Sequence, residues 1–392
     1  MTSSIPKERT IKPPFASLFK SFLRLGLTAF GGPSMVAYIR TMAVEQKQWL
    51  DEESFRDGVA LCQTIPGATA MQTAAYVGLR TRGVGGAIVS FVGFGLPAFI
   101  LMLTFSALYT STHTVPSVTS AFSGLQAIIV AIVANATVSF GKTTLKNWGT
   151  IVIAVVAAVL FGIGVNPLIV IAAAALVGLM LSKGQHASRS ARASTQQPLS
   201  MKPFVLLLAF IVAVFILLLL IQRRLFDLAI LMFRIDLFAF GGGFASVPLM
   251  FHEIVQVRHW MDSSTFLNGI ALGQVTPGPI VITATFVGYM LYGLPGGLVA
   301  TLGVFSPSFL MVIGIVPYFD RLRASPYFNR AMSGILSSFV GLLLTVTVRF
   351  ASHVPWDFPH VLFACAALVA LLLSVDIVWV VLIGTALSVV AL

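Results

Sequence analysis

Long apolar stretches, separated by short polar ones, run along nearly the whole chain. The longer stretches hold roughly 20 apolar residues, the length that a helix needs to cross a hydrocarbon core about 30 Å thick. The first part of the chain contains about six apolar segments, at residues 15–39, 58–79, 84–109, 118–140, 149–163 and 167–181. The last two are short, and one kinked hairpin is an alternative for them. One more lies at 204–222, and six follow it, so the pattern predicts an all-α polytopic membrane protein with about thirteen membrane segments.

Composition agrees with a membrane protein and excludes several other classes. Of the 392 residues, 57% are hydrophobic and 9% are charged, whereas a soluble protein averages about 25% charged residues. We attribute the formal charge of +11 to basic loops at a membrane and not to nucleic acid. Cys62 and Cys365 lack metal-ligand spacing, and we find no nucleotide-binding loop, HExxH motif or Ser/His/Asp set. We therefore expect no enzyme activity, no metal and no cofactor.

The chain consists of two similar halves, offset by 210 or 211 residues. "AFGG" at 29–32 matches 239–242, and "LPAF" at 96–99 matches "SPSF" at 306–309. "WLDEESF" and "GVALCQTIPGA" in the first half match "WMDSSTF" and "GIALGQVTPGP" in the second. The expected organisation is a cytoplasmic tail at 1–14, a first repeat at 15–181, a basic cytoplasmic linker at 182–203, a connecting transmembrane helix at 204–222 and a second repeat at 223–392.

Charge predicts that the second repeat is inverted relative to the first. Six segments plus one connecting helix turn the second half upside down, and cytoplasmic loops carry an excess of Lys and Arg. The first-half loops with Arg80, Arg82, Lys142 and Lys146 would be cytoplasmic, as would the second-half loop with Arg321, Arg323 and Arg330. Arg223, Arg224 and Arg349 are exceptions. The N-terminus and the linker are expected in the cytoplasm and the C-terminus in the periplasm.

Four breaks rich in glycine and proline interrupt the apolar segments: "FGGPS" and "IPGA" in the first half, "FGGGF" and "TPGP" in the second. Irregular backbone persists in a membrane only where protein or a watery cavity surrounds it. A helix that restarts after a break offers free N–H groups to an anion. Broken or re-entrant helices at matching places in two repeats indicate a transporter's binding site. The alternative is that Gly and Pro serve close packing or kinks.

The candidate binding residues are backbone glycines at the breaks and neutral hydrogen-bond donors beside them. They are Thr28, Gly31, Gly32, Ser34, Gln63, Thr64 and Gly67, with Gly241, Gly242, Gly243, Gln274, Thr276 and Gly278. Gln63 and Gln274 occupy equivalent places, although buried amides also tie helices together. Pro33, Pro66 and Pro277 are candidates for gating.

Arg24, Arg234 and Asp236 are the charges most clearly placed within apolar segments, and intramembrane charges are functional candidates. Arg24 and Arg234 are equivalent, which suggests a dianion between two guanidinium groups; alternatively both reach the headgroups. Asp236 has no acidic counterpart, because Gly26 holds that place. It is a candidate to pair with Arg234 or to carry a coupling proton.

These motifs together resemble the chromate ion transporter (CHR) family in its long, two-half form. "FGGP", a Trp-x-Asp connector and Q-x-x-P-G-(A/P) carry the resemblance across both halves. It implies a secondary transporter that exports chromate across the bacterial inner membrane, confers chromate resistance and is driven by the membrane potential or a proton gradient. The sequence departs from symmetry at Gly243, opposite Pro33, and at Ala68, opposite Pro279. The two half-sites are therefore not expected to be equivalent.

Several alternatives stay open at this point. Sulfate and other oxyanions share the tetrahedral shape and charge of chromate, and an anion channel could use the same breaks. A membrane-embedded enzyme would need a cluster of acids, bases or metal ligands, which the sequence lacks. The expected partners are the transported anion and the lipid bilayer; a homodimer is left open.

Overall fold

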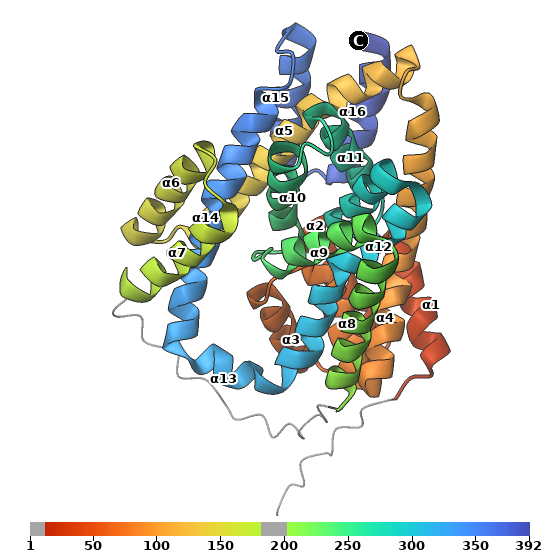
Figure 1. Cartoon of the computed structure of the whole chain (residues 1–392), viewed down its shortest axis with the longest axis vertical. Coiled ribbons are helices and arrows are strands. Elements are labelled where there is room, and N and C mark those ends of the chain that lie inside the picture. Colours follow the sequence, from red (N-terminus) through yellow and green to blue (C-terminus); the bar gives the residue numbers. More distant parts are fainter. Residues whose placement is uncertain (1–11, 182–201) are drawn as a thin grey trace, which may run out of the picture.

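A computed structural model describes residues 12–181 and 202–392, and every regular element in these residues is helical (Figure 1). The expected tail and linker fall mostly outside the described residues. The first half contains α1 (Phe15–Thr28), α2 (Gly32–Arg40), the π-helical turn η1 (Thr41–Gln46), α3 (Glu52–Thr64), α4 (Thr69–Thr112), α5 (Pro116–Thr144), α6 (Trp148–Gly162) and α7 (Pro167–Leu181).

The second half repeats this order after an unmatched helix, α8 (Lys202–Ile221). It contains α9 (Arg223–Leu237), α10 (Gly243–Phe251), η2 (His252–Val257), α11 (Ser263–Val275), η3 (Ile280–Ile282), α12 (Thr283–Ile315), η4 (Val316–Tyr318), α13 (Phe319–Ala324), α14 (Pro326–Ala351), α15 (Phe358–Leu372) and α16 (Ile377–Ala391). The prediction of an all-α polytopic membrane protein is confirmed.

Five helices in the described residues are long and apolar enough to cross a membrane: α4, α5, α8, the stretch from η3 to η4, and α14. None of the residues of α8 is buried within the protein, so its apolar side chains are available to lipid. The remaining predicted segments consist of shorter helices, most of which are joined in pairs.

Two of the long helices fold back on themselves. Gly83 in α4 has a φ of 64°, and a Cβ atom on Gly78 would lie 2.2 Å from the carbonyl oxygen of Gly86. Residues eight apart in a straight helix are separated by about 12 Å along the axis, so α4 has a short arm (69–81) antiparallel to a long arm (84–112). In α12, a hydrogen bond of 2.7 Å between the hydroxyls of Thr285 and Thr301 shows the same reversal, at Tyr292 and Gly293.

The glycine- and proline-rich breaks are the tips of further hairpins. The Tyr76 hydroxyl donates to the Ser54 carbonyl at 3.0 Å, so α3 and the short arm of α4 are antiparallel. Arg234 on α9 forms an ion pair with Glu253 on η2, although 19 residues of straight helix would separate them by about 28 Å. We number the tips along the chain: the first (29–31), the second (65–68), the third (238–242) and the fourth (276–279). The apolar segment at 58–79 is therefore re-entrant, because "IPGA" ends its helix and reverses the chain.

The last helical hairpin of each half packs on the opposite half. The hairpin of α6 and α7 lies along α14, and that of α15 and α16 lies along α5. Figure 1 shows α6 and α7 in yellow-green beside the blue α14. Further contacts join α4 to α12 and α5 to α14. The halves are thus interlocked, not placed side by side.

Contacts at the two ends of the molecule agree with an inverted repeat. At the lower end of Figure 1, Arg323 in α13 forms a 3.2 Å ion pair with Asp57 in α3. At the upper end, near the C-terminus, the His360 ring of α15 lies 2.9 Å from the Ser123 hydroxyl of α5. The basic loop of the second half therefore meets α3 of the first half.

Candidate functional site

The four tips pair crosswise between the halves. The Gly67 N–H of the second tip donates to the Ala239 carbonyl of the third tip at 2.9 Å. The Gly278 N–H of the fourth tip donates to the Ala29 carbonyl of the first tip at 3.0 Å. All four residues are buried. Each tip pair therefore takes one tip from each repeat, and the tips that meet inside the protein are not the ones that match in sequence.

Glycine is required at these tips for both conformation and space. Gly67 and Gly278 have φ values of 114° and 116°, which other residues rarely adopt. A Cβ atom on Gly67 would lie 2.1 Å from the Ser308 hydroxyl oxygen, and one on Gly278 would lie 2.8 Å from the Ala98 Cβ. Gly31, Gly241 and Gly242 also have positive φ values.

The two tip pairs differ in their hydrogen-bond donors. The pair of second and third tips includes or adjoins Ala68 and Gly243, both of which carry a backbone N–H. In the pair of first and fourth tips, Pro279 takes the place of Ala68, and Pro33, the second residue of α2, takes the place of Phe244, the second residue of α10. Neither proline has an N–H to donate. At both places where a proline breaks the symmetry of the repeats, the residue with an N–H therefore belongs to the pair of second and third tips. We call this pair the donor-rich tip pair.

Two helix N-termini face each other at this donor-rich pair. A Cβ atom on Gly242 would lie 3.2 Å from the Thr69 hydroxyl oxygen, and these residues adjoin or begin α10 and α4 respectively. The first N–H groups of a helix lack intrahelical partners, and the helix dipole makes that end positive. Two such ends together can bind an anion without a cationic side chain.

A buried polar cluster adjoins the same tip pair. Asp236 is fully buried, and its Oδ2 accepts from the Ser308 N–H at 3.0 Å and from the Ser308 hydroxyl at 2.7 Å. The Ser308 hydroxyl oxygen in turn accepts from the Ala68 N–H at 2.9 Å. The Gln72 Nε2 donates to the Pro66 carbonyl at 2.5 Å. We call Asp236, Ser308 and Gln72 the Asp236 cluster.

Two acceptor oxygens of the Asp236 cluster, Oδ1 of Asp236 and Oε1 of Gln72, have no hydrogen-bond partner within the described residues. The 210-residue offset places Gly26, Ala98 and Ile282 at the equivalents of Asp236, Ser308 and Gln72. The cluster therefore adjoins one tip pair only, and the other pair has apolar residues in its place.

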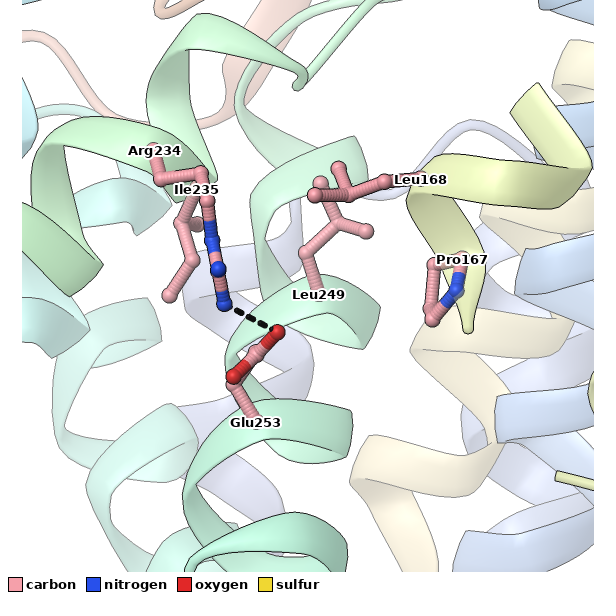
Figure 2. A pocket seen from close by; sticks show the side chains of 6 residues that line it. All are labelled: Pro167, Leu168, Arg234, Ile235, Leu249 and Glu253. Atoms are coloured by element: carbon pink, nitrogen blue, oxygen red, sulfur yellow. Dashed lines mark hydrogen bonds and ion pairs between the residues drawn. The ribbon is translucent and has the colours of Figure 1, made fainter. Parts of the chain in front are cut away.

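The predicted arginines occupy unlike environments. Figure 2 shows Arg234 and Glu253 pointing toward each other in a small pocket that Pro167 and Leu168 also line. Arg24 is exposed on α1, and Met42 holds the place in η1 that is equivalent to that of Glu253 in η2. The hypothesis that Asp236 pairs with Arg234 is wrong. The Asp236 carboxyl group accepts its hydrogen bonds from Ser308, and Arg234 forms its ion pair with Glu253.

The other candidates mostly bind the backbone of their own helix. The hydroxyls of Thr28, Ser34, Thr64 and Thr276 donate to carbonyls three or four residues earlier. Gln63 is exposed, whereas Gln274 is buried and its Nε2 has no partner among the described residues. Pro66 and Pro277 are buried in their tips, and Gly32 begins α2. The side chain of Pro33 lies outside the described residues.

Sequence reasoning overlooked three residues at the donor-rich tip pair. Ser308 and Gln72 complete the Asp236 cluster, and the Phe140 ring of α5 would lie 2.3 Å from a Cβ atom on Gly241. The available signal was asymmetry between the repeats: "SPSF" places Ser308 where "LPAF" has Ala98.

Comparison with known proteins identifies both halves with one family. A family model described as chromate transporter matches residues 16–179 and 226–389. An uncharacterized transporter of Methanocaldococcus jannaschii is 44% identical over 352 residues, covering 89% of this chain and 88% of that protein. No solved structure matches the chain.

Other relatives have names that state a substrate. The chromate transport protein of Pseudomonas aeruginosa is 32% identical over 351 residues, covering 87% of this chain and 82% of that protein. That of Cupriavidus metallidurans is 29% identical over 361 residues, covering 90% and 86%.

Proposed function

Because the chain belongs to the chromate transporter family, we propose that it is a secondary transporter that exports chromate and binds it at the pair of second and third tips. The family and the named relatives support chromate as the anion. Two facing helix N-termini, held together by the Gly67–Ala239 hydrogen bond, support the location.

The crossed pairing of the tips is the observation that carries this proposal. A tetrahedral oxyanion accepts hydrogen bonds in several directions, and the N–H groups around Gly242, Gly243 and Thr69 come from two chain segments. Because each tip pair joins both repeats, a rocking motion of one repeat against the other would open and close the site.

Export needs no ATP in this proposal. Moving one charge across 100 mV is worth about 2.3 kcal/mol. A dianion that leaves a negative-inside cell gains roughly twice that amount, so the membrane potential favours efflux and, with it, chromate resistance. We place the N-terminus and the linker at 182–203 on the cytoplasmic side of the inner membrane, between repeats at 15–181 and 223–392.

Uptake of radiolabelled chromate into inside-out vesicles tests the function. Wild-type vesicles should accumulate chromate when the potential is inside-positive, and Gly242→Leu vesicles with equal protein content should not, because the side chain blocks the N–H groups. Equal uptake by both would place the site elsewhere, and no uptake beyond empty vesicles would overturn the function. Stronger competition by sulfate than by unlabelled chromate would make sulfate the preferred anion.

The orientation is tested by thiol labelling after the exposed native residue Cys365 is replaced by Ala. A membrane-impermeant reagent should label Ser188→Cys in inside-out vesicles and Thr114→Cys in right-side-out vesicles. Labelling of both residues from the same side would contradict the proposed topology.

A further inference from the structure

We propose that Asp236 binds a proton together with the oxyanion, so that the two ions cross the membrane in the same direction. This inference rests on the proposed function, since it assumes that the anion binds at the second and third tips. It adds a coupled ion and the direction in which that ion moves.

The surroundings of Asp236 favour a carboxyl group that gains and loses a proton. The side chain is fully buried, its two hydrogen bonds both come from Ser308, and its Oδ1 has no partner among the described residues. A buried charge is costly without a counter-ion or a full set of hydrogen bonds. Gln72 Oε1 is the other unpartnered oxygen of the Asp236 cluster.

A hydrogen-bonded chain connects this carboxyl group to the proposed anion site. The Ala68 N–H donates to the Ser308 hydroxyl oxygen, and that hydroxyl donates to Asp236. Ala68 directly precedes α4, so an ionised Asp236, linked to Ala68 through Ser308, places a negative charge near the positive helix end that would otherwise attract the anion. Like charges repel strongly in a protein interior. Proton binding therefore favours anion binding, and by linkage anion binding favours proton binding.

Among the described residues, no cationic side chain is bonded to the Asp236 carboxyl group and could neutralise it in place of a proton. The titratable groups on the elements packed against α9 are Tyr289 and Tyr292 on α12, His252 and Glu253 on η2 after α10, and Lys202, the first residue of α8. The short arm of α4, beside Asp236, carries Tyr76 and Arg80, and α9 itself carries Arg223, Arg224, Asp227 and Arg234. Among the described residues, Ser308 makes every hydrogen bond to the Asp236 carboxyl group, and Arg234 is bound to Glu253.

The asymmetry of the repeats limits the coupling to one proton. Gly26 and Ala98, at the places equivalent to Asp236 and Ser308, have no titratable group and no hydroxyl. The pair of first and fourth tips therefore binds no proton, and a dianion moves with a net charge of one instead of two.

The experiment measures chromate affinity from pH 5 to pH 9 in detergent for the wild type, Asp236→Asn and Asp227→Asn. Chromate itself binds a proton in this range, so each affinity is divided by that of Asp236→Asn at the same pH. The ratio for the wild type should fall with rising pH, by up to about tenfold per pH unit for one linked proton. Asp227→Asn, a neutralised carboxyl on the same helix, should follow the wild type. In weak buffer, chromate should cause proton uptake by the wild type beyond that by Asp236→Asn.

A wild-type ratio that does not change with pH would overturn the coupling and leave chromate binding intact. Absence of chromate binding by the wild type at every pH would instead overturn the proposed function, and the inference with it. If Asp236→Asn does not fold, Ser308→Ala replaces it, because losing the hydroxyl donor destabilises the charged carboxylate. Its affinity should then begin to fall at a higher pH than in the wild type, and an unchanged or lower pH would contradict the inference.

Discussion

Arg24 and Arg234 stand at equivalent places in the two repeats, yet only Arg234 has an acidic partner within the described residues. Glu253 is mostly buried, and Arg258 lies 3.7 Å from its second oxygen. Removing Arg234 leaves a buried carboxylate with this one weak partner. A fully buried pair loses about 3–5 kcal/mol on truncation, and the partial exposure of Arg234 reduces this value through solvent screening.

We therefore expect Arg234→Gln to lower the free energy of unfolding by about 1–2 kcal/mol, and Arg24→Gln by less than about 0.5 kcal/mol. Denaturant titration in detergent would measure both. The double variant Arg234→Gln with Glu253→Gln should recover part of the loss, because no carboxylate is left unpaired. Equal losses of stability for the two arginines would contradict this difference in their environments. They would favour the alternative that both arginines bind the same dianion.

Asp357, at the start of α15, should make the protein less stable as the pH falls. The hydrogen bond from His360 holds the pKa of this carboxyl below its usual value of 3.8. A lowered pKa contributes stability above pH 3.8, and this contribution is lost as the pH falls through the lowered pKa. Asp357→Asn keeps a helix-capping side chain, so thermal unfolding should show it less stable than the wild type at pH 6 and similar to it below about pH 3. A difference that persists or grows in acid would show that the charge is not the cause.

At the scale of elements, the left-handed glycines fall into two kinds that one pair of variants separates. Gly67 lies in the second tip, where an added Cβ would meet Ser308 at 2.1 Å, whereas Gly83 turns α4 with no atom within 4 Å of an added Cβ. Gly67→Ala should abolish chromate transport, because the tip must move away from Ala239. Gly83→Ala should retain transport and lose about 1 kcal/mol of stability from backbone strain.

Transport assays in vesicles, normalised to folded protein, would measure both alanine variants. Transport by Gly67→Ala at the wild-type rate would show that the close contact of the second and third tips is unnecessary. Loss of transport in Gly83→Ala alone would assign function to the turn of α4 and not to the tip.

Much of this element-scale picture follows from sequence. Gly and Pro mark all four tips, and the repeat shows which tips are equivalent. The crossed pairing of the tips cannot be predicted from the sequence. Its hydrogen bond, from Gly67 to Ala239, joins backbone atoms that every residue type except proline can supply. Asp236 stands out as a charge without a counterpart, but its partner Ser308 lies 72 residues away and could be found only once the helices were placed.

At the scale of the whole molecule, the number and order of the apolar segments were predictable. The packing of the last hairpin of each half on the opposite half was not. The helices α6, α7, α15 and α16 are apolar on all sides, so no polar face indicates which neighbour each one contacts. Small residues decide the packing: Gly334 of α14 comes so close to α7 that an added Cβ would lie 2.0 Å from the Ala174 carbonyl oxygen.

Interlocking predicts that neither half is stable alone. If the chain is divided within residues 182–203 and both parts are expressed together, they should copurify and bind chromate, because α6 and α7 then find α14. Each part expressed singly should aggregate or be degraded. Size-exclusion chromatography in detergent would measure this, with the undivided chain as control, and a monodisperse first half on its own would contradict it.

Because the last hairpin of each half packs on the opposite half, the order of synthesis decides when each hairpin can meet its partner helix. The hairpin of α6 and α7 is complete at residue 181, but its partner α14 begins only at residue 326, which is 145 residues later. At about 5–20 residues per second, a ribosome needs roughly 7–30 s to bridge that interval. Throughout it, the small-residue face of α7 lies open to lipid and to the cell's quality-control proteases. The hairpin of α15 and α16 has no such delay, because α5 is already in the membrane when it emerges. Early degradation during synthesis should therefore act chiefly on chains stalled between α8 and α14.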